Sequence, residues 1–140
     1  VMILEGEKIA NKYIASFSKL MRLTLDITKS NNISLDTEIN YLELYLDIEK
    51  KRLQNNLQVS FNTSISFDVL KRIKIPSMLF QPIIENAIIH GLNKKKGNKK
   101  IILTFCVADN SLIVEIIDNG IGRKQSQEIK TKNQLKQNLI

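Results

Sequence analysis

Asn86 and His90 are the first pair of residues whose types and spacing could do chemistry. They lie four residues apart within Glu85–Gly91, so a helix would place them on one face. A carboxamide oxygen suits Mg²⁺, which takes few protein ligands and completes its shell with phosphate oxygens and water. Two plainer roles remain open: Asn86 could cap or pair locally, and the helix dipole favours a histidine near a helix end.

The second candidate segment is Asp118-Asn119-Gly120-Ile121-Gly122, which follows a predicted strand. An ionised aspartate at a strand end can accept a hydrogen bond from an exocyclic amino group such as that of adenine. The two glycines let the backbone approach a flat ligand closely. The same residues are common in plain turns. The dinucleotide fingerprint is excluded, because Gln125 stands where its third glycine is needed.

Helices that could position these residues follow from apolar spacing near 3.6 residues. This spacing predicts helices at 7–28, from Ser34 to about residue 54, and at 77–89. The Ser34 hydroxyl is expected to cap the second helix by accepting from backbone N–H groups. Pro82 should kink the third helix or shift its start, and Gly91 is a natural helix stop.

Strands are predicted where apolar and polar residues alternate, at 57–63, 101–107 and 112–117, with a turn at Asp109-Asn110 between the last two. Residues 64–76 are predicted to be a connection, and 123–140 are polar and compatible with a helix. This order predicts an α+β sandwich preceded by a helical arm. The wide apolar face of helix 7–28 predicts packing on another helix, from this chain or a second one.

The composition of the 140-residue chain narrows the class of protein. Residues 71–140 hold 13 Lys+Arg against 5 Asp+Glu, whereas residues 1–70 hold 8 against 9. This asymmetry suggests an anionic partner, although lysines also cover ordinary solvated faces. The lack of tryptophan and of any nucleic-acid-binding signature argues against nucleic acid. The single cysteine, Cys106, excludes an internal disulfide framework and favours a reducing cytoplasm.

Together the two segments resemble the N box and the first glycine box of the Bergerat ATP-binding fold. An N-x-x-x-H helix precedes a strand pair and then D-x-G-x-G, all within about 35 residues. The surrounding motifs make the chain similar to the LytS/YehU-type sensor histidine kinases over roughly residues 10–125. Those motifs are Ser34–Glu38, Tyr45–Glu49 with Arg52, Ile75-Pro76, Gln81-Pro82, Glu85–Ala87 and His90-Gly91.

The resemblance implies a two-layer α/β sandwich with helices on one face of a mixed sheet. It also implies a role for each residue at the site. The N-box Asn of these kinases, here Asn86, holds the Mg²⁺ that bridges the phosphates of ATP. The residue one turn later, here His90, contributes to the nucleotide pocket. The glycine-box Asp, here Asp118, receives the adenine amino group, while Gly120 and Gly122 shape the floor under the base and the hinge of the ATP lid.

Two further residues keep open roles. Glu85 lies beside the implied metal site and could be catalytic, and Lys94 could contact a phosphate or belong to a solvated loop. The related ATPases that hydrolyse ATP carry a Glu one turn before the metal-binding Asn, where it can activate water. Pro82 stands at that position here, which favours phosphoryl transfer over dedicated hydrolysis.

The resemblance also implies that parts of the kinase lie outside this sequence. The family's phosphoacceptor histidine stands in the first helix of a dimerisation hairpin, but His90 is the sole histidine here. We therefore expect residues 1–32 to be the second hairpin helix. Residues 33–140 are then the ATP-binding catalytic domain, without a complete lid or the second glycine box.

The implied ligands are ATP and Mg²⁺, and the implied partners are a response regulator and a second copy bound through helix 7–28. Nucleic acid is not expected. The implied location is the cytoplasmic part of a membrane-anchored parent kinase. The alternative function is a non-enzymatic dimerisation or interaction module built on the same fold.

Overall fold

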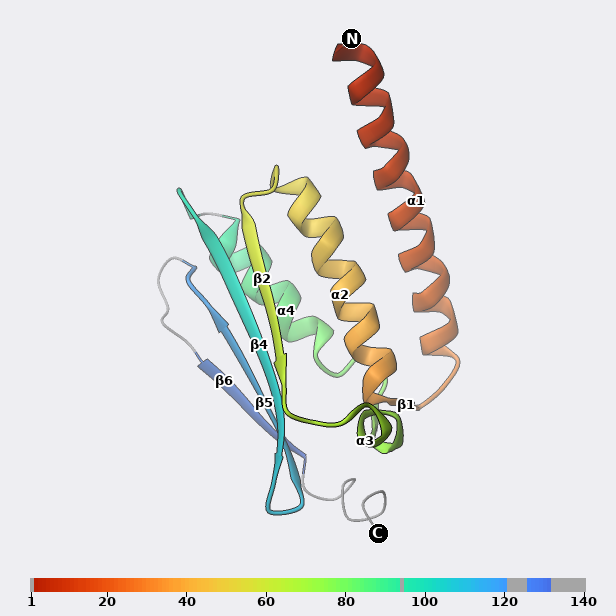
Figure 1. Cartoon of the computed structure of the whole chain (residues 1–140), viewed down its shortest axis with the longest axis vertical. Helices are drawn as coiled ribbons and strands as arrows, with labels where there is room; N and C mark the ends of the chain where they lie inside the picture. The colour runs from red at the N-terminus through yellow and green to blue at the C-terminus, as the bar shows by residue number, and fades with distance from the viewer. Residues whose placement is uncertain (1, 94, 121–125, 132–140) are drawn as a thin grey trace.

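The computed structural model describes residues 2–93, 95–120 and 126–131, with side chains described for 6–93 and 95–120 (Figure 1). Lys94 and Gly122 lie outside the described residues. The elements in chain order are α1 (Met2–Thr28), β1 (Asn32–Ser34), α2 (Leu35–Arg52), β2 (Leu57–Thr63), α3 (Phe67–Arg72), β3 (Lys74–Pro76), α4 (Gln81–Asn86), the π-helix η1 (Ala87–Leu92), β4 (Lys99–Ala108), β5 (Ser111–Asp118) and β6 (Ser126–Thr131).

The main sheet has four strands in the order β2-β4-β5-β6. β2 runs parallel to β4, and the other two pairings are antiparallel, so the sheet is mixed as expected. The β4–β5 hairpin turns at Asp109 and Asn110, whose φ angles are 52° and 59°. Aspartate and asparagine tolerate this left-handed conformation, which matches the twist of a two-residue hairpin. A second, small sheet pairs β1 with β3.

Helices α2 and α4 cover one face of the main sheet, and α1 lies outside α2 (Figure 1). The core between the sheet and these helices is apolar; its sheet side is formed by Leu57, Ile101, Leu103, Phe105, Leu112, Val114 and Ile116. Phe80, just before α4, meets Phe105 edge to face, with ring centroids 6.1 Å apart. The predicted two-layer α+β sandwich with a helical arm is confirmed.

Helix α1 packs on α2 through one face and leaves another apolar stripe exposed. Leu20 and Ile27 are buried against the rest of the chain. The exposed stripe consists of Ile14, Phe17, Met21 and Leu25. The prediction that this helix packs on another helix is confirmed within the chain. Among the described residues, no helix is long and apolar enough to cross a membrane.

Several local predictions needed correction. Ser34 occupies the N-cap position of α2, but it makes no side-chain cap bond and contacts the side chains of Asp36 and Thr37 instead. The predicted connection 64–76 contains α3 and β3. Residues 126–131, expected to be helix-compatible, form the edge strand β6. Short elements carry too few periods for a sequence pattern to reveal them.

Candidate functional site

The N-box helix, which we define as α4 and η1 together (Gln81–Leu92), is buried on one side and open on the other. Ile84 and Ile88 are at most 1% exposed and anchor it in the core. Asn86 and His90 are exposed, so both polar side chains are available to a ligand. The helix starts at Gln81, so Pro82 falls in its first turn, where a missing N–H does no harm. The predicted shift of the helix start is confirmed.

Gly91 does not end the helix, and that prediction was wrong. The backbone changes from α- to π-helical bonding, in which the N–H of Asn93 donates to the carbonyl oxygen of Ile88 at 2.8 Å. The lack of a side chain on Gly91 serves a different purpose. It lets another backbone segment lie directly against the helix, and π-helical turns often mark functional sites.

That other segment is the glycine box at the end of β5. A Cβ atom on Gly120 would lie 2.5 Å from Gly91 Cα, and one on Gly91 would lie 3.1 Å from Asp118 Oδ1. Asp118 Oδ1 accepts a hydrogen bond from the Gly120 N–H at 2.8 Å. The fold therefore brings the two candidate segments into backbone contact through a pair of glycines. Gly120 is required for this packing, whatever it does for a ligand.

Asn119 fastens the glycine box to the start of β4, a role that sequence reasoning missed. Its side-chain oxygen accepts from the Lys100 N–H at 2.7 Å, and its amide nitrogen donates to the Asn98 carbonyl at 3.0 Å. Its own N–H donates to the Lys100 carbonyl at 3.1 Å. These three bonds hold the residue that follows Asp118 against the start of β4. The only sequence signal was the general preference of asparagine for turns.

Glu85 interacts with residues of α4 and α2. One of its carboxylate oxygens accepts from Gln81 Nε2 at 2.7 Å. Burial raises the pKa of Tyr45 on α2, and the negative charges of Glu49 and Glu85 raise it further. Burial likewise raises the pKa of Tyr41, again with a contribution from Glu85. Glu85 therefore lies among polar groups between α4 and α2.

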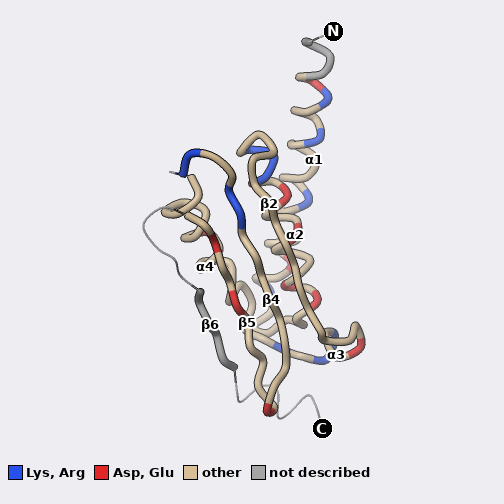
Figure 2. The backbone as a smooth tube through the Cα atoms, turned by 60° about the vertical axis from the view of Figure 1, so that its left-hand side comes forward, with Lys and Arg blue, Asp and Glu red and all other residues tan. Residues whose placement is uncertain are grey.

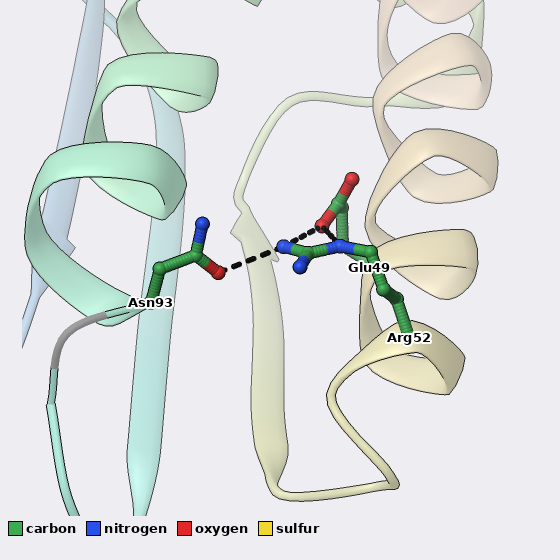
Figure 3. A network of polar contacts seen from close by, with 3 residues as sticks. All are labelled: Glu49, Arg52 and Asn93. Carbon is green, nitrogen blue, oxygen red and sulfur yellow. Dashed lines mark hydrogen bonds and ion pairs between the residues drawn. The ribbon is translucent and has the colours of Figure 1, made fainter.

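A polar network joins the far end of the N-box helix to α2 (Figure 3). Arg52 Nε donates to Glu49 Oε2 at 2.7 Å, and Arg52 Nη2 lies 2.6 Å from the same oxygen. Arg52 Nη2 also donates to Asn93 Oδ1 at 2.8 Å. Asn93 is the C-cap residue that directly follows η1. Glu49 and Arg52 have the i,i+3 spacing that places two residues on one helix face, whereas no sequence signal pointed to Asn93.

Glu38 on α2 is a buried carboxyl group that sequence reasoning also missed. It has no exposed surface, and burial raises its pKa to about 7. The backbone N–H groups of Phe80 and Met78 lower the pKa in part, although neither is aligned as a full hydrogen bond. Its position between Leu35 and Leu42 on the apolar face of α2 was the available signal, because an acid there needs a partner.

Basic residues gather along the loop that leads from the N-box helix into β4 and along the start of β4 (Figure 2). Lys99 is 8% exposed, and its Nζ donates to the Lys95 carbonyl at 2.8 Å. This lysine stabilises the loop, while Lys96 and Lys100 are exposed. Part of the basic excess therefore lies near the two boxes, and part has a structural role.

The protein donor atoms near the site fit a cation that is held mainly by a bound substrate and by water. The described residues contain no group of three or more His, Cys, Asp or Glu side chains that could hold a metal ion by themselves. Asn86 offers one exposed carboxamide oxygen. That arrangement suits Mg²⁺ bound through one protein ligand, water and substrate phosphates.

Comparison with known proteins identifies relatives among the sensor kinases. A family model described as histidine kinase matches residues 1–57. Sensor protein kinase HptS of Staphylococcus aureus is 32% identical over 126 residues, covering 90% of this chain and 23% of the relative. Sensor protein LytS of Oceanobacillus iheyensis is 30% identical over 118 residues, covering 84% and 20%. The uncharacterized protein YwpD of Bacillus subtilis is 31% identical over 122 residues, covering 86% and 42%.

The class of protein defined by this fold and these matches is the sensor histidine kinases. Within that class, the chain belongs to the LytS type. It spans between a fifth and about two fifths of the length of the curated relatives that it matches.

Proposed function

We propose that this chain is the ATP-binding catalytic region of a two-component sensor histidine kinase, which transfers the γ-phosphoryl group of ATP to a histidine. The observation that carries the proposal is the contact between Gly91 and Gly120. It unites a helix bearing an exposed Asn86 with a strand end bearing Asp118. Without this contact the two motifs would be separate turns with no common ligand.

The chain's own residues bind and orient the nucleotide in this proposal. Asp118 Oδ1 is engaged by the Gly120 N–H, which leaves Oδ2 to accept from the adenine amino group. Asn86 would hold Mg²⁺, which when bound neutralises phosphate charge. His90 would contribute to the nucleotide pocket. Phosphoryl transfer of this kind depends mainly on positioning and charge neutralisation, and Pro82 offers no base for water.

The acceptor histidine belongs to another part of the parent kinase in this proposal, because His90 lies in the N-box helix. The phosphoryl group would pass from that histidine to an aspartate on a response regulator. Residues 1–32 would be the second helix of the dimerisation hairpin, and residues 33–140 the catalytic domain. We place this region in the cytoplasm, as part of a membrane-anchored parent.

Replacing Asp118 with Asn should weaken ADP binding by at least about tenfold, or roughly 1.4 kcal/mol. Asn can keep its oxygen for the Gly120 N–H, but it then presents a donor NH₂ group to the adenine amino group. Isothermal titration calorimetry measures the loss. The matched control is Asp109→Asn in the β4–β5 turn, which should bind ADP normally. Unchanged ADP affinity in Asp118→Asn would show that this residue does not read the base.

The exposed stripe on α1 supports dimerisation as a second property, which would also serve a non-enzymatic interaction module. Ile14, Phe17, Met21 and Leu25 recur at intervals of three and four residues and are between 46% and 60% exposed. This spacing is typical of a helix seam that packs against another helix. A symmetric partner helix would bury the stripe and remove its apolar surface from water.

Met21→Glu should raise the dimer dissociation constant by at least about tenfold, because it places a charge within the apolar seam. Light scattering across a range of protein concentrations measures the change. Ala15→Glu is the control, since Ala15 is exposed on α1 outside the stripe. A wild-type chain that stays monomeric while binding ADP would exclude the interaction module and leave the catalytic proposal intact.

A further inference from the structure

The N-box helix begins without a cap of its own. The residue before it is Phe80, which has no polar side-chain atom, and no side-chain cap bond is present. Pro82 in the first turn has no N–H to donate. Met78, in the preceding turn, has a left-handed backbone with a φ of 62°. A non-glycine residue keeps such a conformation only where its surroundings enforce it.

Glu38, on α2, lies beside this turn. The backbone N–H groups of Phe80 and Met78 act on its carboxyl group, which has no exposed surface. Neither carboxyl oxygen makes a fully aligned hydrogen bond to any described residue. A buried carboxyl group facing backbone N–H groups can supply the acceptor that a helix start lacks.

We propose that Glu38 is a positioning residue for the nucleotide site: its carboxyl group holds the turn Met78–Phe80 and thereby sets where the N-box helix begins. The helix is continuous from Gln81, so Asn86 lies about 7 Å further along its axis. A change at the turn moves Asn86 relative to the glycine box. This inference rests on the proposed role of Asn86, but its structural part can be tested separately.

Three substitutions of Glu38 test whether this site needs a hydrogen-bond acceptor or only a side chain of similar volume. Glu38→Gln keeps an acceptor oxygen without the charge. Glu38→Met fills a similar volume without any acceptor, and removing a buried acid in this way would stabilise a site that only needed packing. Glu38→Asp withdraws the carboxyl group by one methylene. Glu43→Gln and Glu43→Met, at an exposed position on the same helix, are the matched controls.

The first measurement is amide hydrogen exchange of residues 83–88 by NMR in the full chain, without nucleotide. Glu38→Gln should exchange like the wild type, Glu38→Met at least about tenfold faster, and Glu38→Asp in between, because loss of the acceptor loosens the helix start. Wild-type exchange in Glu38→Met would overturn the proposal. If Glu38→Met does not fold, Glu38→Asp provides the test. Exchange in Glu38→Asp as slow as in the wild type would then overturn the proposal.

The second measurement is calorimetry with ADP in the presence of Mg²⁺ and in the presence of EDTA. The Mg²⁺-dependent gain in affinity should persist in Glu38→Gln and fall at least about fivefold in Glu38→Met, while the affinity in EDTA, which depends on Asp118, changes little. An equal loss in both conditions would mean general damage and contradict the positioning role. If the wild type binds no ADP, the proposed function fails, and the exchange data alone still decide whether Glu38 holds the helix.

Discussion

Replacing Gly120 with Ala is expected to separate the two boxes and to lower the free energy of unfolding by about 2–3 kcal/mol. The added Cβ would lie 2.5 Å from Gly91 Cα and 2.6 Å from its carbonyl carbon. Backbone atoms cannot give way as a flexible side chain can, so the glycine box must move off the N-box helix. ADP affinity should fall at least about tenfold with it. Urea denaturation and calorimetry measure the two effects.

Two other glycines provide a graded comparison. The Cβ atom of Gly91→Ala would lie 3.1 Å from Asp118 Oδ1. This is a milder steric conflict, so it should lower the stability less than Gly120→Ala does. Gly6→Ala in α1 meets no atom within 4 Å and should be neutral or slightly stabilising, since alanine favours a helix. If Gly120→Ala were as stable as Gly6→Ala, the glycine contact would not hold the boxes together.

Glu38→Gln is expected to remove a large pH dependence of stability. The folded-state pKa of Glu38 is about 7, above its ordinary value of 4.5, mainly because burial disfavours the charged form. Tyr41 on α2 interacts electrostatically with Glu38 and supplies no positive charge. Between pH 4.5 and about 7, the folded state therefore binds more protons than the unfolded state. The free energy of unfolding falls as pH rises through this range.

The size of this effect follows from the two pKa values. Each pKa unit corresponds to roughly 1.4 kcal/mol, so the wild type should lose about 2–3 kcal/mol between pH 5 and pH 8 because of Glu38. Glu38→Gln removes this contribution, so its loss of stability between pH 5 and pH 8 should be smaller by the same amount. Urea denaturation at both pH values measures the difference. Glu43→Gln is the control and should keep the wild-type slope. An unchanged slope in Glu38→Gln would mean that another group titrates.

The hairpin and the buried strands were predictable because their signals are local. Alternating side chains marked β2, β4 and β5, since one face of each strand packs on the core. Asp109 and Asn110 adopt the left-handed conformations that their short polar side chains allow. Pro82 correctly indicated a shifted helix start, because a missing N–H is tolerated only in the first turn.

Other elements were not predictable because tertiary contacts determine them. Gly91 looked like a helix stop, but the π-helical turn carries the chain past it to meet Gly120. Strand β6 has a polar sequence and forms by pairing with β5, whose edge would otherwise be unpaired. Ser34 kept its position at the start of α2, yet its hydroxyl found side-chain partners instead of the backbone.

The identities and spacing of Asn86, His90 and Asp118 were enough to propose a chemistry for the site, because the donor and acceptor properties of a side chain do not depend on the fold. The pairing of Gly91 with Gly120, the bond from Arg52 to Asn93 and the burial of Glu38 beside Phe80 join residues that are 29 to 42 positions apart. Such contacts depend on how α2, the N-box helix and the sheet pack together, which no local pattern encodes.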